Sequence, residues 1–164
     1  MEIRIEDKTK FIETMKDRLT VDPETTAIVA VDMHQGHLDQ EIATMLVDED
    51  ERQRVLKNSQ RLIAIARQYK IPVIHVIFQL RPIENKHKYS IGINTNTCDL
   101  CASFESVNRG FKLIMISDCV ASGYGRDLHV FALQNVARCL GWVLTISEFE
   151  KKLNTGIDPR SLDD

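Results

Sequence analysis

The sequence has 164 residues, of which 43% are apolar, and a formal charge of −3 with a pI near 6.0. This length fits one core, so we expect a single domain over 1–164, with 1–22 as an N-terminal helical extension. The charge excludes the concentrated basic face that nucleic acid requires. Apolar runs such as 27–31 are far shorter than the roughly 20 residues that span a bilayer. No secretion signal is recognisable either, so we expect a cytoplasmic protein whose partners are small molecules or proteins, with neither nucleic acid nor a membrane among them.

The pattern of apolar residues predicts alternating strands and helices. Phe11, Met15 and Leu19 stand at helical spacing and predict an amphipathic helix within 6–19. The apolar run 26–33 is typical of a strand buried on both faces, and Asp32 lies at its end. Further along the chain, the predicted elements are a helix over 51–69, strands over 72–78 and 112–118, a helix over 127–140 and a last strand over 142–146.

Strands separated by helices imply parallel pairing with right-handed crossovers. We therefore predict an α/β fold of three layers, in which helices cover both faces of a mainly parallel, Rossmann-like sheet. Ligands of such sheets bind beyond the carboxyl ends of the strands. Asp32 is expected at that edge.

Cys98 is the strongest candidate nucleophile. It follows a segment of small polar residues and precedes a helical pattern of Leu100, Phe104 and Val107. A cysteine at a helix N-terminus has a lowered pKa, and the free backbone N–H groups there can hold an oxyanion. Cys98 and Cys101 also form a C-x-x-C pair, which leaves a thiol-disulfide function open. Cys101, Cys119 and Cys139 are otherwise expected to be small buried residues.

Several motifs occur in the order found in isochorismatase-like cysteine hydrolases. They are VDMHQGHLD at 31–39, KHKYS at 86–90 and GINTNTC at 92–98 with Gly110, followed by SDCVAS at 117–122, His129 and GWVLTISEF at 141–149. The chain resembles this superfamily over most of residues 25–149. The superfamily includes nicotinamidases, N-carbamoylsarcosine amidohydrolase and biuret or ureido amidohydrolases.

The resemblance implies a role for each matching residue. The catalytic aspartate, lysine and cysteine of the superfamily match Asp32, Lys86 and Cys98, and Lys88 is a fallback for the lysine. A cis peptide bond near 93–94 is expected, and the backbone N–H groups of Asn94 and Cys98 would form the oxyanion hole. Separately, Arg81 follows the second predicted strand, where its planar guanidinium could bind a substrate carboxylate; a surface role is the alternative.

One region departs from the superfamily pattern. Only about a dozen residues separate Lys86 from Cys98, where the usual members have a helix and an inner strand. We expect this strand to be missing or reduced to about 91–94, which would leave backbone groups of its neighbours unpaired. Three explanations are open: the chain is rebuilt there, a partner fills the gap, or the sequence lacks internal segments.

The resemblance thus implies a cysteine-dependent amidohydrolase that cleaves a C–N bond of a small amide or ureido compound through a thioester-type intermediate. The alternative is a catalytically silent relative that acts as an oligomeric or binding module, its site lost through the shortened 79–97 region. Asp32, His34 and His37 offer metal-ligand types, but their spacing matches no closed site. We expect no metal and no cofactor. Assembly into homodimers or homotetramers is expected from the superfamily and from the apolar face of the N-terminal helix.

Overall fold

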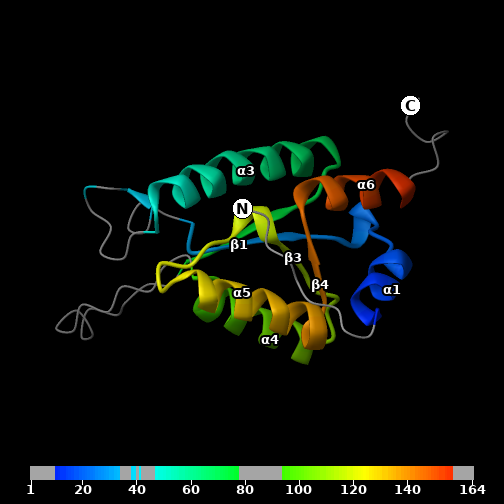
Figure 1. Ribbon diagram of the computed structural model, residues 1–164. Helices are drawn as coiled ribbons and strands as arrows, with labels where there is room; N and C mark the ends of the chain where they lie inside the picture. Colours follow the sequence, from blue (N-terminus) through cyan, green and yellow to red (C-terminus); the bar gives the residue numbers. More distant parts are fainter. Residues whose placement is uncertain (1–9, 34–37, 40, 42–46, 78–93, 157–164) are drawn as a thin grey trace.

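The computed structural model describes residues 10–33, 38–39, 41, 47–77 and 94–156. Its helices and strands form three layers, with α3 and α6 on one side of the strands and α4 and α5 on the other (Figure 1). The predicted α/β fold is confirmed, and each predicted strand is present in shorter form.

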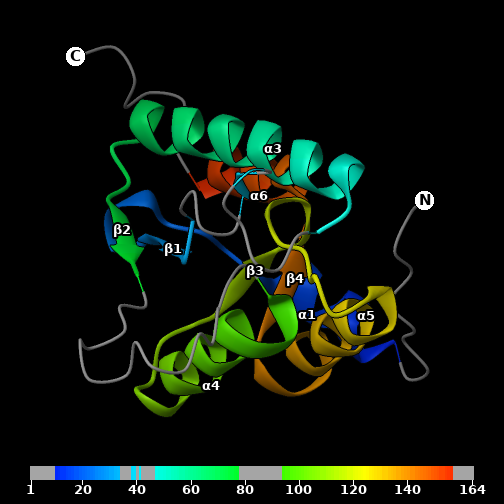
Figure 2. The same cartoon turned by 90° about the vertical axis from the view of Figure 1, so that its left-hand side faces the viewer.

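The strands form two separate parallel pairs. β1 (Ile28–Val31) pairs with β2 (Val73–Val76), and β3 (Ile114–Ile116) pairs with β4 (Trp142–Leu144). Figure 2 shows β1 and β2 beneath α3, with β3 and β4 forming a second unit beside them. Within the described residues, no strand joins the two pairs into one sheet. This break is consistent with a missing inner strand. Residues 91–93, where a shortened strand was expected, lie outside the description.

Helices connect and flank the strand pairs. Their bounds are α1 (Phe11–Arg18), α3 (Glu49–Gln68), α4 (Leu100–Asn108), α5 (Arg126–Asn135) and α6 (Ile146–Gly156), with π-helical turns η3 (Thr95–Asp99) and η5 (Val136–Leu140) and short 3₁₀ turns η1 (Pro23–Thr25) and η4 (Ser117–Cys119). The sequence analysis did not predict α6. The helix begins with a capping box, in which the Thr145 backbone N–H donates to Glu148 Oε2 at 2.7 Å and the Glu148 N–H donates to Thr145 Oγ1 at 3.2 Å.

Two apolar clusters hold the layers together. The larger lies between the strands and the α3–α6 layer and contains Leu62, Ile65, Leu144 and Phe149. The second lies between the β3–β4 pair and α5; its buried members are Met115, Leu133, Val136, Ala137 and Val143. Because apolar burial is the main source of stability in a domain of this size, these clusters fix both strand pairs against their helices.

The β1–β2 pair buries one face more fully than the other. Ile28 and Val73 pack against the larger cluster. The residues that alternate with them point to the opposite face, where Val29, Ile74 and Val76 are 51%, 49% and 46% exposed. Described helices therefore cover both faces of the β3–β4 pair but leave half of the β1–β2 pair open.

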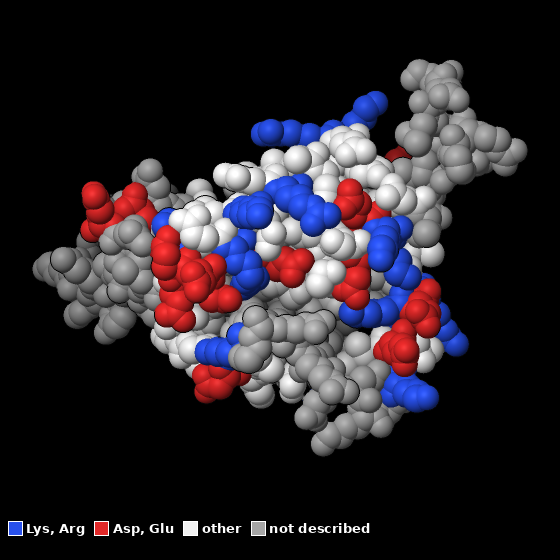
Figure 3. Space-filling model, turned by 45° about the horizontal axis from the view of Figure 1, so that its top comes forward, with Lys and Arg blue, Asp and Glu red and all other residues white. Residues whose placement is uncertain are grey.

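The outer surface of α3 and α6 carries basic and acidic side chains side by side (Figure 3). Arg52 pairs with Glu49 along α3 at 2.7 Å, and Arg61 of α3 pairs with Glu150 of α6 at 2.9 Å. None of the described helices is both long enough and apolar enough to cross a bilayer.

Candidate active site

Asp32 lies directly after β1, at the carboxyl end of the strand. Its backbone N–H donates to the Val76 carbonyl at 2.8 Å, which continues the β1–β2 ladder by one bond. Its φ of 50° lies in the left-handed region, which an aspartate tolerates better than most residues do. The side chain is buried, since only 2% of the residue is exposed. A buried carboxyl group on an unusual backbone conformation at a strand end is a frequent feature of functional sites.

Cys98 lies in the turn η3, which runs directly into α4. The half-buried thiol makes a side-chain hydrogen bond with Asp32, and the Thr97 hydroxyl donates to its sulfur at 3.9 Å. The structure therefore brings Asp32 and Cys98 together, although 65 residues separate them in the sequence. Their catalytic roles remain predictions.

The acidity of Cys98 differs from the sequence prediction. Burial and the hydrogen bond with the Asp32 carboxyl raise the pKa of Cys98 to about 11. The predicted lowering of the pKa is wrong because the helix N-terminus is outweighed by desolvation and by neighbouring negative charge, both of which disfavour a thiolate. In the resting protein Cys98 is therefore a neutral thiol.

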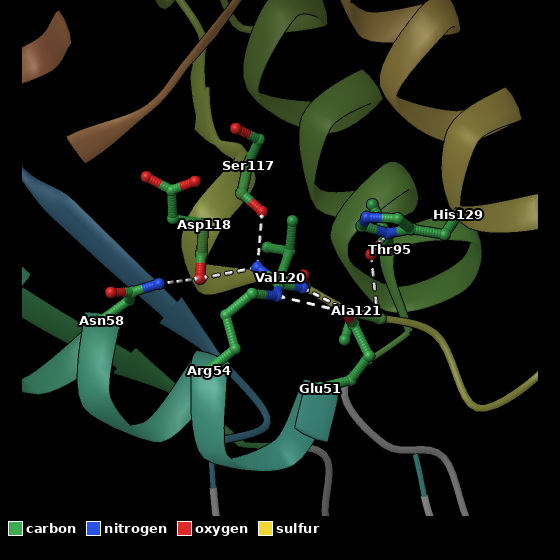
Figure 4. A network of polar contacts seen from close by, with 9 residues as sticks. All are labelled: Glu51, Arg54, Asn58, Thr95, Ser117, Asp118, Val120, Ala121 and His129. Atoms are coloured by element: carbon green, nitrogen blue, oxygen red, sulfur yellow. Dashed lines mark hydrogen bonds and ion pairs between the residues drawn. The ribbon is translucent and has the colours of Figure 1, made fainter. Parts of the chain in front are cut away.

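A buried histidine supports the turn that carries Cys98 (Figure 4). The Thr95 hydroxyl donates to the Ala121 carbonyl at 2.8 Å and lies 2.8 Å from Nδ1 of His129, a residue of α5. Because the hydroxyl proton is already used, Nδ1 of His129 must be the donor in the second bond. Burial lowers the pKa of His129 to about 4, so the ring is neutral. From the sequence, His129 was identified only as part of the resemblance.

Arg54 of α3 stabilises the segment that follows β3 (Figure 4). Its guanidinium donates to the carbonyls of Ser117, Asp118 and Val120 at 3.2, 2.9 and 2.9 Å. It also forms an ion pair with Glu51, and its hydrogen bond to the carboxylate lowers the pKa of that glutamate. This segment leads to Ala121, the acceptor for Thr95, so α3 helps to position the turn that carries Cys98.

The remaining predicted site residues divide into two groups. Asn94 is buried, and its side-chain oxygen accepts from the Gly123 backbone N–H at 2.9 Å, which fixes the start of η3. Lys86 and Arg81 lie outside the described residues, as do His34 and His37 and the first residue of the expected cis bond, Ile93. Within the described ranges, no cluster of three or more metal-ligating side chains occurs.

Comparisons with known proteins agree with this fold. The isochorismatase domain family matches residues 86–148. A cysteine hydrolase from Pseudomonas syringae pv. phaseolicola 1448A has a similar structure, with a TM-score of 0.70 and 17% sequence identity over 85% of this chain and 97% of that chain. The comparison with curated proteins gave no match.

The chain thus has a fold similar to that of a cysteine hydrolase. The matched segment and the similar fold both agree with the isochorismatase-like superfamily that the motifs predicted. Family and fold support a hydrolase.

Proposed function

We propose that the protein is a cysteine-dependent hydrolase that cleaves a C–N bond of a small amide or ureido compound. The observation that carries this proposal is the hydrogen bond between the Cys98 thiol and the buried Asp32 carboxyl. A thiol nucleophile needs an adjacent base because only its thiolate attacks carbonyl carbon efficiently. Asp32 is such a base, and its position at the carboxyl end of β1 is where a parallel α/β protein binds ligands.

The proposed reaction has two stages. Asp32 takes the proton of Cys98 as the sulfur bonds to the carbonyl carbon, and the protonated Asp32 then gives this proton to the departing nitrogen as the C–N bond breaks. Water next attacks the resulting thioester, loses a proton to Asp32 and releases an acid, while the sulfur regains a proton. Because the resting thiol has a pKa of about 11, a nearby positive charge is needed to stabilise the sulfur as it loses its proton. The superfamily pattern assigns this task to Lys86.

Two further parts of the proposal concern substrate binding. The backbone N–H groups of Asn94 and Cys98 form the oxyanion hole, and Arg81 binds a carboxylate of the substrate. The buried position of Asn94 and its bond with Gly123 support a fixed backbone at the first of these groups. Preorganised donors are the groups that stabilise a tetrahedral intermediate most strongly.

A panel of primary amides and ureido compounds, assayed by ammonia release, tests this function. We expect turnover by the parent protein and a loss of at least about a hundredfold in kcat/KM for Cys98→Ser and Asp32→Asn. Asparagine is suited to this test because it tolerates a left-handed backbone as aspartate does. Lys86→Met should lose activity, whereas Lys88→Met should keep it. A panel without turnover, or variants as active as the parent, would contradict the proposal.

Selective labelling with iodoacetamide is a poor test of Cys98 in the resting protein. Cys101 and Cys139 are exposed, whereas Cys98 is half-buried and has a raised pKa. The exposed thiols should therefore react first in the resting protein. Replacement of both by serine allows the reaction of Cys98 to be followed with less interference.

The silent-relative alternative is supported by the open β1–β2 face. Exposed Val29, Ile74 and Val76 form an apolar surface of the kind that interaction sites use. A stable, folded protein that turns over no amide and self-associates would favour this alternative. Sedimentation velocity also tests the proposed assembly into dimers or tetramers, which is compatible with either function.

A further inference from the structure

A second carboxyl group lies beside the nucleophile and has no role in the reaction above. Asp99 follows Cys98 at the junction of η3 and α4. Its Oδ2 atom is inaccessible to solvent and makes no hydrogen bond in the described part of the protein. The backbone carbonyl of Asp99 is occupied, since the Ser103 hydroxyl donates to it at 2.6 Å. A buried carboxylate oxygen without a donor is costly, whereas a neutral carboxyl group in the same place costs much less.

The surroundings of Asp99 also disfavour its ionised form. The negative charge of Asp32, at the end of β1, raises the pKa of Asp99. The charge of an ionised Asp99 likewise raises the pKa of the Cys98 thiol. α5 packs against η3, where its neutral His129 contacts Thr95. The charged groups Arg54 and Glu51 of α3 and Arg126 of α5 interact with His129. Burial is the largest cause of the raised pKa of Asp99, and the negative charge of Asp32 is the second.

We propose that Asp99 is a positioning residue that keeps a proton beside Cys98, so that Asp32 alone acts as the base of the site. The catalytic role of Asp99 rests on the proposed function, whereas its protonation can be tested without a substrate. Two neighbouring carboxyl groups in unequal surroundings commonly divide into one that is ionised and one that is neutral. The raised pKa of Asp99, about 7, agrees with this division.

Asp99 transfers no proton in this scheme. The proton of Cys98 moves to Asp32 and then to the leaving nitrogen, while the Asp99 proton stays in place. Loss of the Asp99 proton above neutral pH would add a negative charge next to the sulfur and make the thiolate harder to form. Asp99 would therefore limit the reactivity of Cys98 on the alkaline side.

The experiment compares Asp99→Asn with the parent in a Cys101→Ser, Cys139→Ser background. Mass spectrometry measures the rate at which iodoacetamide modifies Cys98 between pH 5.5 and 9. Asparagine is neutral at every pH, so it imitates protonated Asp99. We expect equal rates below pH 6 and a rate for the variant that is roughly 3- to 10-fold higher above pH 8. The matched control, Asp17→Asn on the exposed surface of α1, should follow the parent throughout.

A variant-to-parent rate ratio that stays constant across this range would overturn the proposal, because Asp99 would then not change its charge there. The parent gives an independent reading if the variant does not fold. Its logarithmic rate should rise less steeply with pH around 7 than on either side, and a uniform slope would equally overturn the proposal. Alkylation needs no turnover, so the two assays fail independently. If no amide is hydrolysed but the alkylation rates show the expected ratio, the hydrolase function is rejected and the protonated Asp99 is retained.

Discussion

Replacement of Arg54 by methionine should destabilise the protein far more than loss of an exposed arginine. Methionine retains much of the apolar stem but no donor, so the carbonyls of Ser117, Asp118 and Val120 lose their guanidinium partner. Hydrogen bonds from a charged donor contribute about 1.5–3 kcal/mol each when buried. The Arg54 side chain is 29% exposed, so water replaces part of the loss. We therefore expect the free energy of unfolding to fall by about 2–4 kcal/mol in total.

Arg61→Met is the matched control for this experiment. Arg61 lies on the same helix and pairs with Glu150, but its side chain is 50% exposed. Exposed ion pairs contribute less than about 1 kcal/mol, so the control should unfold almost like the parent. Urea unfolding of all three proteins, with midpoints and slopes compared, measures the difference. Equal losses for the two variants would refute the view that Arg54 fixes the segment after β3.

Three further predictions follow from the packing and titration of single residues. Burial lowers the pKa of His129 from 6.5 to about 4, so between these values the unfolded chain binds a proton that the folded chain does not. Stability should therefore fall as the pH drops from 6.5 to 4, by about 3 kcal/mol, and urea unfolding of His129→Gln should lack this part of the decline. Gly141→Ala would place a methyl group against the Leu113 carbonyl and should cost about 1–3 kcal/mol in urea, with a stability equal to that of the parent counting against this contact. Thr145→Ala removes the cap of α6 and should lower the free energy of unfolding by about 1 kcal/mol, which a lower thermal midpoint would reveal. An unchanged midpoint would argue against the capping box.

The strands could be predicted because each lies within a continuous apolar run, although burial on both faces was wrong for β1, where Val29 is 51% exposed. Ile28–Val31 and Ile114–Ile116 both lie inside such runs, and each is followed within two residues by an aspartate. α6 was missed even though Thr145 and Glu148 have capping-box spacing and Ile146, Phe149 and Leu153 follow a helical period. Its start was assigned to the preceding strand, because the apolar pattern of β4 continues into Ile146 without a turn residue.

The site was harder to predict because the pKa values of its residues depend on burial and on nearby charged groups. Motif order was sufficient to pair Asp32 with Cys98, which are in contact in the structure. The sign of the Cys98 pKa shift was wrong, since a sequence shows that a helix begins near a cysteine but not how much water the fold removes from it. The protonation of Asp99 depends on the same burial and on a carboxyl group 67 positions away, so no local pattern could reveal it.

The division of the strands into two pairs means that Asp32 and Cys98 are attached to separate parts of the fold. Asp32, the proposed proton acceptor, belongs to one pair, whereas the thiol is carried by a turn bound to the other through Thr95 and Ala121. A small shear between these two units would separate donor from acceptor while each unit stayed folded. Because α3 contacts both units, we expect its contacts to help keep Asp32 beside Cys98. If these two residues react as proposed, a substitution in α3 far from the sulfur should lower activity while the protein stays folded.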